Sequence, residues 1–360
     1  MTAGGPAARR VLVVRLDGAG DVVLAGPAVR AAAAAPGAEV TLLCGPDGAA
    51  AGRLLPGVRR VLVWPSPWVV APAPPVTAAD VDDIVARLAA HTFDEAVVLT
   101  SFHQSPLPTA LLLRLAGIPR ITGASVDYPG SLLDVRLRPG EDLPEDLPEP
   151  ERALAIAAAA GFDLPPGDDG RLAVRRPPAV GSLLGPLSGR PYAVVHPGAA
   201  VPARRWPAEH HRRTVRLLAR AGLPAVVTGG AGECELTAAV AGDDGLDLGG
   251  RTDLPQLTGV LAGAAALVVG NTGAAHLAAA VGTPVVSLFA PVVPAVRWRP
   301  YRVPHVLLGD QHAPCRDSRA RICPVPGHPC LARITPEQVL DAVRRLVAVP
   351  VNGPVKEGTP

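Results

Sequence analysis

The chain has 360 residues, of which 48% are hydrophobic, 18% are charged and 3% are aromatic. This apolar content excludes a mainly disordered chain, and the length fits about two domains. The formal net charge of +2 and the few aromatic rings favour no nucleic-acid partner, and no apolar run reaches the roughly 18 residues of a membrane-spanning helix.

Short apolar runs alternate with Ala- and Leu-rich stretches through the first half of the chain. The runs predict buried strands at Val11–Val14, Val40–Leu43, Val61–Trp64 and Ala96–Leu99. The stretches between them predict helices at Leu24–Ala35, Asp80–His91 and Pro108–Ala116. Strand–helix alternation with nearly continuous apolar strands is typical of a doubly wound parallel sheet.

A change of composition between residues 139 and 189 predicts a domain boundary. Residues 139–150 are acidic and proline-rich, a helix is predicted at Glu151–Ala160, and residues 165–189 are rich in Pro, Gly and Arg. Such a segment is typical of a linker. We therefore predict an N-terminal Rossmann-like domain at 1–180 and a C-terminal one at 181–360, with a hinge near residue 180.

The second half repeats the alternation of strands and helices. Strands are predicted at Ala193–His196, Ala225–Thr228, Leu246–Leu248, Ala266–Val269 and Val285–Phe289. Helices are predicted at Ala208–Ala221, Cys234–Ala241, Leu254–Ala262, Ala274–Val281 and Pro336–Val347. Ligands of such sheets bind beyond the carboxyl ends of the strands, where we expect the functional motifs to lie.

The first motif, residues 15–21, follows the first predicted strand. Gly18 and Gly20 would let the backbone approach a ligand closely. Val23 stands where a dinucleotide-binding fingerprint has its third glycine, which argues against an NAD-type site. Asp21 at the start of the helix either caps that helix or serves as a general base, and the motif alone leaves both readings open.

Two further motifs follow strands of the second half. His196-Pro197-Gly198 precedes Arg204-Arg205, a pair suited to a diphosphate or, alternatively, part of a solvated basic patch. The glycine-rich turn Thr228–Glu233 suits close approach of a nucleotide. There Glu233 either accepts hydrogen bonds from a ribose or caps its own helix.

The fourth motif runs from Gly270 to Phe289 and is the most specific. An Asn-Thr-Gly turn opens a helix of small residues, whose first free N–H groups would bind phosphate oxygens. His276, about one turn into this helix, either faces the ligand or is a hydrogen-bonded core histidine.

Taken together, four motifs strongly resemble the ADP-heptose:lipopolysaccharide heptosyltransferase family, glycosyltransferase family 9. They are RLDGAGDVVLAGPAVRA, HPGA…RRWP, TGGAGECE and NTGAAHLAAAVGTPVVSLFAP. The similarity covers roughly residues 10–345, with the motifs in the family's order. It implies a GT-B fold, in which two Rossmann-like αβα domains face each other across a cleft. It also implies an inverting, metal-independent transfer of a heptose or related sugar from a nucleotide-diphosphate donor, ADP-linked in the family, without a cofactor.

The resemblance assigns roles residue by residue. It makes Asp21 the general base and Arg204 the group that neutralises the leaving diphosphate. On the donor side it places Gly198, Arg205, Gly230, Glu233, Thr252, Asn271, Thr272, Gly273 and His276. On the acceptor side it places Arg15, Gly18 and Gly20. The family commonly has Asp at position 271, so Asn271 puts the identity of the donor sugar in question more than the reaction type.

The acceptor is expected to be a hydroxyl of a glycan, a glycolipid or a natural product. Residues 64–68 and 101–104 are candidate acceptor loops, or alternatively packing and loop residues. The odd number of cysteines and the absence of a signal-peptide pattern lead us to expect a cytoplasmic enzyme, in peripheral contact with the inner membrane face if the acceptor is lipid-linked.

His312, Cys315, Cys323, His328 and Cys330 cluster within 19 residues but lack the paired spacing of common zinc sites. We expect a loop with buried or occasionally oxidised thiols, with a structural metal site as the alternative, and no metal in the active site. Two alternatives to glycosyl transfer stay open: a nucleotide-sugar epimerase of similar architecture, and a nucleotide-sugar-binding protein that has lost catalysis.

Overall fold

The computed structural model describes residues 9–101 and 103–347. They form two compact units, of which the first comprises residues up to 178 together with 272–281 and 294–302. The second comprises 179–271, 282–293 and the residues from 303 onward. Each unit contains one parallel six-stranded sheet, which confirms the predicted α/β class. The domain boundary at residue 180 and the cleft stay predictions.

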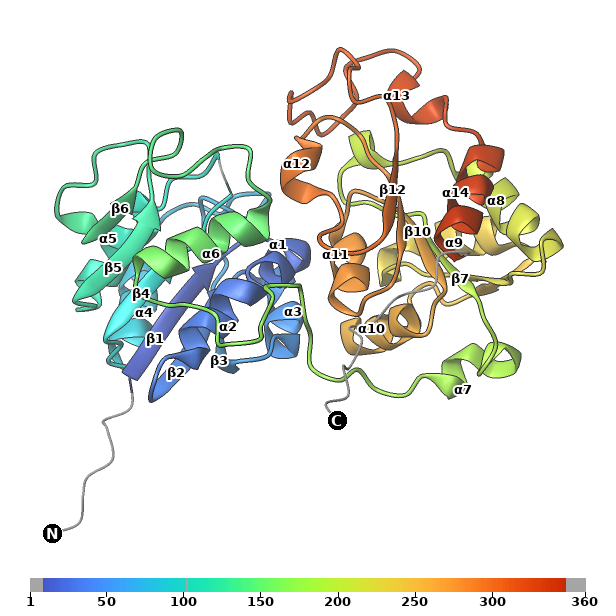
Figure 1. Ribbon diagram of the computed structural model, residues 1–360. Helices are drawn as coiled ribbons and strands as arrows, with labels where there is room; N and C mark the ends of the chain where they lie inside the picture. The colour runs from blue at the N-terminus through green and yellow to red at the C-terminus, as the bar shows by residue number, and fades with distance from the viewer. Residues whose placement is uncertain (1–8, 102, 348–360) are drawn as a thin grey trace, which may run out of the picture. The chain divides into compact units, whose positions relative to one another are not determined.

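The first sheet has the strand order β3-β2-β1-β4-β5-β6 (Figure 1). Its strands are β1 (Arg9–Arg15), β2 (Ala38–Cys44), β3 (Val58–Val63), β4 (Glu95–Val98), β5 (Arg120–Ala124) and β6 (Val135–Leu137). Strand β1 lies in the interior of the sheet and is buried from its third residue onward, as its run of branched apolar side chains predicts.

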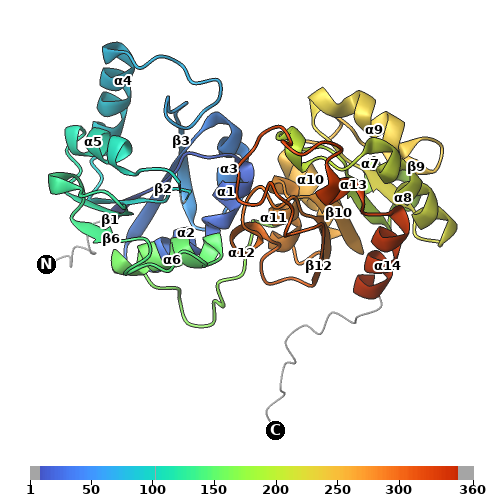
Figure 2. The same cartoon turned by 90° about the horizontal axis from the view of Figure 1, so that it is seen from above.

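Helices cover both faces of this sheet. They are α1 (Ala19–Leu24), α2 (Gly26–Ala34), α3 (Ala49–Leu54), α4 (Ala78–Ala89), α5 (Leu107–Leu115) and α6 (Glu149–Ala159). Helices α2 and α6 lie side by side on one face, and α4 and α5 lie on the other (Figure 2). The first unit also includes α11 (Gly273–Ala280) and α12 (Ala295–Trp298).

The second sheet has the strand order β12-β11-β10-β7-β8-β9. Its strands are β7 (Ala193–His196), β8 (Ala225–Val227), β9 (Gly245–Asp247), β10 (Ala266–Gly270), β11 (Val285–Leu288) and β12 (His305–Leu308). The helices of this unit are α7 (Gly181–Leu184), α8 (Ala208–Arg220), α9 (Cys234–Ala241), α10 (Leu254–Ala262), α13 (Pro329–Ala332) and α14 (Pro336–Val347). Apolar side chains of α8 and α14 pack together on the central strands.

Several predicted elements differ from the structure. The predicted helix Leu24–Ala35 is two helices, α1 and α2, because Pro27 is tolerated only in the first turn of a helix and α2 begins just before it. The short strands β5, β6 and β12 were not predicted, since β5 contains Gly, Arg and Thr, and β6 and β12 are only half-buried edge strands.

The predicted linker at 165–189 is wrong in its first part. Residues up to 178 belong to the first unit, where the backbone N–H of Arg175 donates to the carbonyl of Leu54 at 2.7 Å. Arg30 binds Asp168 in the same region, with Nε to Oδ2 at 2.6 Å, and Leu172 is buried. The polar composition that indicated a linker thus reflects a segment held on the surface of the first unit by backbone and ionic bonds.

In the described part of the chain, every helix is too short or too polar to cross a lipid bilayer.

Leu113 and Leu111 lie two residues apart on α5, with exposed fractions of 0% and 47%. We expect Leu113→Ala to lower the free energy of unfolding by about 2–5 kcal/mol, because it empties space in a packed core. Leu111→Ala makes the same change of helix propensity on the exposed side of the helix. Its free energy of unfolding should stay within about 0.5 kcal/mol of the wild-type value. Chemical denaturation of both variants tests this, and equal losses would contradict the placement of α5.

Candidate functional site

A buried arginine lies at the carboxyl end of β1. Arg15 is 2% exposed and its guanidinium is surrounded by three carboxylates. Its Nε lies 2.9 Å from Asp17 Oδ2, its Nη2 2.8 Å from Asp21 Oδ1, and its Nη1 3.3 Å from Glu149 Oε2. The loop after β1, the first turn of α1 and the first turn of α6 therefore meet at one cation.

The charges of this cluster depend on one another. Burial alone would lower the pKa of Arg15, but the carboxylates of Asp17, Asp21 and Glu149 outweigh burial and raise it, so the cation persists. Burial raises the pKa of Asp17 and of Glu149, while Arg15 opposes that rise in both. Loss of Arg15 would leave buried carboxylates without their counter-ion, a costly arrangement.

Asp21 is the carboxylate of this cluster that faces outward. Its side chain is 28% exposed, more than those of Asp17 and Glu149. Helix α1 is capped by Gly18, and Asp21 does not cap it, which removes one of the two readings of this residue. Its Oδ1 accepts from Arg15 and, within the same unit, from Trp298 Nε1 at 3.4 Å. Its Oδ2 accepts no hydrogen bond from the described residues, so it is available to a ligand.

The loop after β4 supports the cluster from the neighbouring strand. Ser101 Oγ accepts from Arg15 Nη2 at 2.9 Å, and Gln104 Nε2 donates to Asp17 Oδ1 at 2.7 Å. Part of the predicted acceptor loop 101–104 thus holds the arginine and its acids in place. Phe102 lies outside the described residues.

Glu149 and Arg152 are functional candidates that the sequence did not reveal. Both are buried near the start of α6, and Arg152 Nη1 donates to the carbonyl of Thr100 at 3.4 Å. An acidic residue in a first turn is ordinary helix chemistry, so no local signal distinguishes Glu149.

The acceptor-side role of Arg15 stays a prediction. The structure shows its guanidinium buried and enclosed by acids and Ser101. In the other predicted acceptor loop, Trp64 is buried and packs edge-on against Trp68. Trp68 Nε1 donates to Thr109 Oγ1 at 3.2 Å, so these rings are packing residues.

In the second unit, the motifs after β7 and β8 come together. A Cβ atom at Gly198 would clash with the carboxylate of Glu233, so the two loops are in close contact there. Glu233 Oε2 accepts from the backbone N–H of Gly230 at 2.9 Å, which is the capping role considered for it. His196 Nδ1 lies 3.0 Å from Thr228 Oγ1, and burial lowers the pKa of this histidine against the opposing charge of Glu233.

The two arginines of the second motif are held by the protein. Arg204, at the end of the short turn Pro202–Arg204, donates from Nη1 to the carbonyl of Asn271 at 3.3 Å. Arg205 Nε donates to the carbonyl of Ala199 at 2.8 Å. Arg204 is thereby fixed next to the turn that precedes α11. Thr252 lies just before Asp253, the N-cap of α10.

Asn271 has a structural reason to be an amide. Its side chain is buried and faces the backbone of Ala290, with Nδ2 3.5 Å from the carbonyl oxygen and Oδ1 3.4 Å from the N–H. An aspartate could accept from that N–H but would place a negative charge against the carbonyl. The departure from the family's usual Asp therefore matches the local hydrogen bonding, and the role of Asn271 toward a sugar stays a prediction.

Helix α11 begins at a hydroxyl group that has no hydrogen-bond partner among the described residues. Thr272 is its N-cap residue but makes no side-chain cap, and Thr272 Oγ1 is buried without a hydrogen-bond partner among the described residues. His276 is buried one turn further on. Within the first unit α11 packs on α1, where a Cβ at Gly20 would lie 2.9 Å from Gly273 Cα and 3.2 Å from His276 Cδ2. Gly20 is thus needed for helix packing.

All five cysteines are free thiols. Burial, followed by the neighbouring thiols of Cys315 and Cys323, raises the pKa of Cys330 to about 12. His328 is turned to the carbonyl of Ala203, with Nε2 at 3.0 Å from that oxygen. Within residues 9–101 and 103–347, no three His, Cys, Asp or Glu side chains are arranged to hold a metal ion.

Comparison with known proteins agrees with these features. The model of glycosyltransferase family 9 (heptosyltransferase) matches residues 83–327. Lipopolysaccharide heptosyltransferase 2 of Escherichia coli is 29% identical over 276 residues, which cover 71% of this chain and 76% of that protein. Matches to the corresponding enzymes of Haemophilus influenzae and Salmonella typhimurium span about half of those relatives, 49% and 48% of their lengths.

Two solved structures share the fold. The family 9 glycosyl transferase from Veillonella parvula has a TM-score of 0.76 and 19% identity, over 94% of this chain and 97% of that one. The ADP-heptose lipopolysaccharide heptosyltransferase II of E. coli has a TM-score of 0.72 and 22% identity, over 94% and 98% of the two chains. These likenesses confirm the predicted GT-B fold, and the family match favours glycosyl transfer over the epimerase alternative.

The contact between Gly198 and Glu233 can be tested by substitution. Gly198→Ala should displace the Glu233 carboxylate and break its bond to Gly230, which lowers the free energy of unfolding by about 1 kcal/mol. Gly232→Ala, where a Cβ meets open space, is the matched control. In the Glu233→Ala background the added cost of Gly198→Ala should disappear. A cost that stays the same in both backgrounds would show that the two residues do not interact.

The buried side chain of His211 leads us to expect that acid destabilises the folded protein. It lies in α8 with its ring 4.8 Å from that of Trp206, and burial, followed by His196 and His210, lowers its pKa from 6.5 to about 3. The folded state therefore holds His211 in its neutral form. The contribution of this neutral ring to the free energy of unfolding is complete above pH 6.5 and declines as the pH falls toward 3. In that range, the free energy of unfolding should fall with decreasing pH at a slope that approaches about 1.4 kcal/mol per pH unit.

Urea denaturation between pH 7 and pH 4.5 measures this slope. His211→Phe keeps an aromatic ring against Trp206 and should flatten the pH dependence of the unfolding free energy. His312→Gln, at an exposed histidine, should leave the wild-type slope unchanged. A His211→Phe variant as acid-sensitive as the wild type would exclude this residue as the cause.

Proposed function

Because the chain belongs to glycosyltransferase family 9, we propose that it transfers a heptose or a related sugar from an ADP-linked donor to an acceptor hydroxyl, with inversion at the anomeric carbon. The family makes the protein a glycosyltransferase. The choice of donor is supported by the names of its relatives, which include an ADP-heptose heptosyltransferase. The acceptor in this proposal is a hydroxyl of a glycan, a glycolipid or a natural product.

One observation carries the mechanism: the Asp21 carboxylate is fixed through Oδ1 by buried Arg15, and its Oδ2, at the carboxyl edge of the sheet, accepts no hydrogen bond from the residues that the structure describes. A general base must be held in position and still be reachable by the proton it removes. Asp21 takes the proton of the acceptor hydroxyl while the acceptor oxygen forms a bond to the anomeric carbon. The bond from that carbon to the donor diphosphate breaks from the opposite side, and ADP leaves.

Arg15 acts as a positioning residue in this scheme. Its guanidinium binds Asp21 and is itself held by Asp17, Glu149 and Ser101. A side chain held at several points keeps a reactive geometry that a single contact would lose. The acids around Arg15 therefore act on catalysis through the orientation of Asp21.

The donor side of the proposal rests on Arg204 and the start of α11. Charge grows on the diphosphate as it leaves, and a guanidinium held nearby stabilises it without a metal ion. Arg204 is fixed on the carbonyl of Asn271, the residue that precedes Thr272 and Gly273. The first turn of α11 has no side-chain cap, and the Thr272 hydroxyl has no hydrogen-bond partner among the described residues, so this turn suits phosphate oxygens.

The nucleoside is assigned to the loops after β7 and β8. Glu233 uses Oε2 for the N–H of Gly230, which leaves Oε1 for a ribose hydroxyl. Gly198 keeps the facing loop close to that carboxylate. A lipid-linked acceptor would bring the enzyme into peripheral contact with the inner membrane face.

Asp21→Asn tests the proposed base. The amide oxygen can still accept from Arg15, but the side chain can no longer take a proton, so turnover with an ADP-sugar should fall by about 10²–10⁴-fold. ADP should raise the melting temperature of variant and wild type equally, and more than UDP, GDP or dTDP does. Asp47→Asn, at an exposed carboxylate on the same edge of the sheet, is the control and should keep wild-type turnover.

The outcomes separate the parts of the proposal. Unchanged turnover in Asp21→Asn would exclude Asp21 as the base while leaving the donor assignment intact. Stabilisation by another nucleotide would overturn the ADP-linked donor. Absence of turnover in the wild type with every donor, together with retained ADP binding, would favour the binding protein that has lost catalysis.

A further inference from the structure

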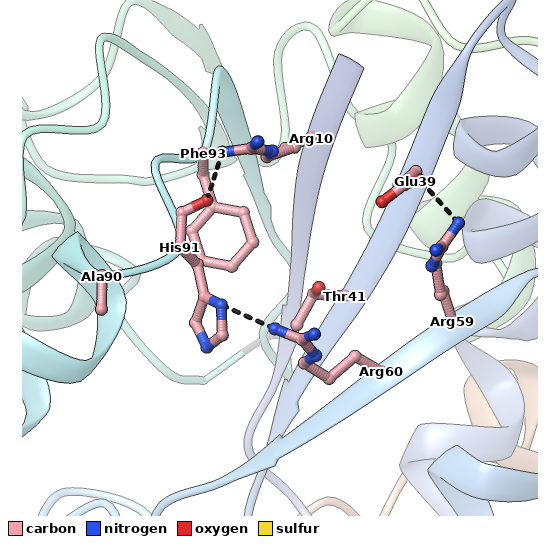
Figure 3. A pocket seen from close by; sticks show the side chains of 8 residues that line it. All are labelled: Arg10, Glu39, Thr41, Arg59, Arg60, Ala90, His91 and Phe93. Carbon is pink, nitrogen blue, oxygen red and sulfur yellow. Dashed lines mark hydrogen bonds and ion pairs between the residues drawn. The ribbon is translucent and has the colours of Figure 1, made fainter. Parts of the chain in front are cut away.

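A basic cavity lies at the amino ends of β1, β2 and β3, on the side covered by α4. Its volume is about 300 Å³. Figure 3 shows the side chains that line it: Arg10, Glu39, Thr41, Arg59, Arg60, Ala90, His91 and Phe93. All of them belong to the first unit.

This cavity is separate from the proposed catalytic site. Arg10 is the second residue of β1 and Arg15 is its last, so the cavity and the catalytic cluster lie toward opposite ends of one strand. At about 3.3 Å per residue, those two backbone positions are roughly 16 Å apart along the strand. Nothing in the proposed reaction uses the residues of the cavity.

Two guanidinium groups in the cavity are held by a histidine. Arg60 Nη1 lies 2.8 Å from His91 Nδ1, and Arg10 Nη1 donates to the carbonyl oxygen of His91 at 3.3 Å (Figure 3). Arg10 also donates from Nη1 to the hydroxyl of Thr92. Each of these acceptors is neutral, so the contacts fix the two cations without compensating their charge.

The acids nearby are already engaged. Glu39 is the one acidic residue among the described residues that line the cavity, and it binds Arg59 with an Oε1–Nη1 distance of 2.5 Å. Asp94, close to Arg10 in the fold, accepts the backbone N–H of Arg10 at 2.7 Å. Arg10 and Arg60 thus form no ion pair with a described acid, and both guanidinium groups retain N–H donors.

His91 adds a further donor. Burial, followed by the charges of Arg60, Arg10 and Arg87, lowers its pKa, so the ring is neutral near pH 7. Its Nδ1 accepts from Arg60, which assigns the proton of the neutral ring to Nε2. The cavity is therefore rich in hydrogen-bond donors and poor in unengaged acceptors.

An irregularity in β3 brings two arginines to the cavity. Val58 pairs with Val40, but the next pair is Arg60 with Thr41, so Arg59 is an extra residue in the ladder. Such bulges are rare between parallel strands and redirect side chains. In regular pairing, successive side chains would point to opposite faces, whereas here Arg59 and Arg60 both line the same cavity.

We propose that this cavity is a binding site for a phosphate group, carried either by a small phosphorylated metabolite or by an anionic phospholipid headgroup. Planar guanidinium groups match the oxygens of a phosphate, and two of them with uncompensated charge favour an anion over a neutral ligand. The volume of about 300 Å³ accommodates a phosphate or pyrophosphate with a small attached group.

Calorimetric titration of the full chain with pyrophosphate tests the small-molecule source. Saturating ADP is present throughout to occupy the nucleotide site. We expect Arg60→Gln to weaken pyrophosphate binding by about tenfold or more, since it removes one charged donor. Arg120→Gln, at an exposed arginine outside the cavity, is the matched control and should bind as the wild type does. Arg60 is itself exposed, and a thermal melt verifies that the variant is folded.

Co-sedimentation with vesicles tests the lipid source. Wild type, Arg60→Gln and Arg120→Gln are mixed with vesicles of phosphatidylcholine alone or with one third phosphatidylglycerol. If Arg60→Gln, but not Arg120→Gln, weakens binding to the anionic vesicles, the phosphate belongs to a lipid headgroup. If Arg60→Gln, but not Arg120→Gln, weakens the binding of pyrophosphate, the phosphate belongs to a small molecule. If Arg60→Gln matches Arg120→Gln in both assays, the proposal is overturned, whatever the outcome for turnover.

Discussion

The carboxyl edge of the first sheet depends on one buried cation. A guanidinium without water is stable only when its charge and N–H groups are satisfied, so Arg15 requires partners from the loop after β1, from α1 and from α6. The loop after β1 and α1 follow Arg15 directly in the sequence, whereas α6 is distant, and the need to surround Arg15 brings all three to one point. Asp21 is the most exposed of its acids, so the interaction that organises this edge also orients the proposed base.

The second unit builds its candidate site differently. Each of its contacts includes a neutral backbone group: the N–H of Gly230 on Glu233, the carbonyl of Ala290 on the amide of Asn271, and the carbonyl of Asn271 under Arg204. Fixed backbone dipoles and one held cation suit a ligand that brings its own negative charge. A base that removes a proton instead needs a carboxylate of fixed orientation, which the cluster in the first unit provides.

The two ends of the first sheet carry opposite arrangements of charge. At the carboxyl end three acids surround one arginine, and at the amino end three arginines line a cavity with a single acid. The strands keep the two ends apart, so a ligand at the amino end would not compete with substrates at the other. The bulge in β3 shows that regular pairing is interrupted where the basic cavity forms.

Local pattern in the sequence determined much of this protein. Apolar runs located nine of the strands, because a buried strand needs apolar side chains whatever its neighbours are, and glycine-rich turns after them located Asp21, Glu233 and Thr272. The path of the folded chain decided the rest. Glu149 reaches Arg15 across 134 residues, and residues 165–178 lie on the first unit although they resemble a linker. A sequence pattern reports how one segment is buried, whereas the partner of a buried charge depends on which segments the fold brings together.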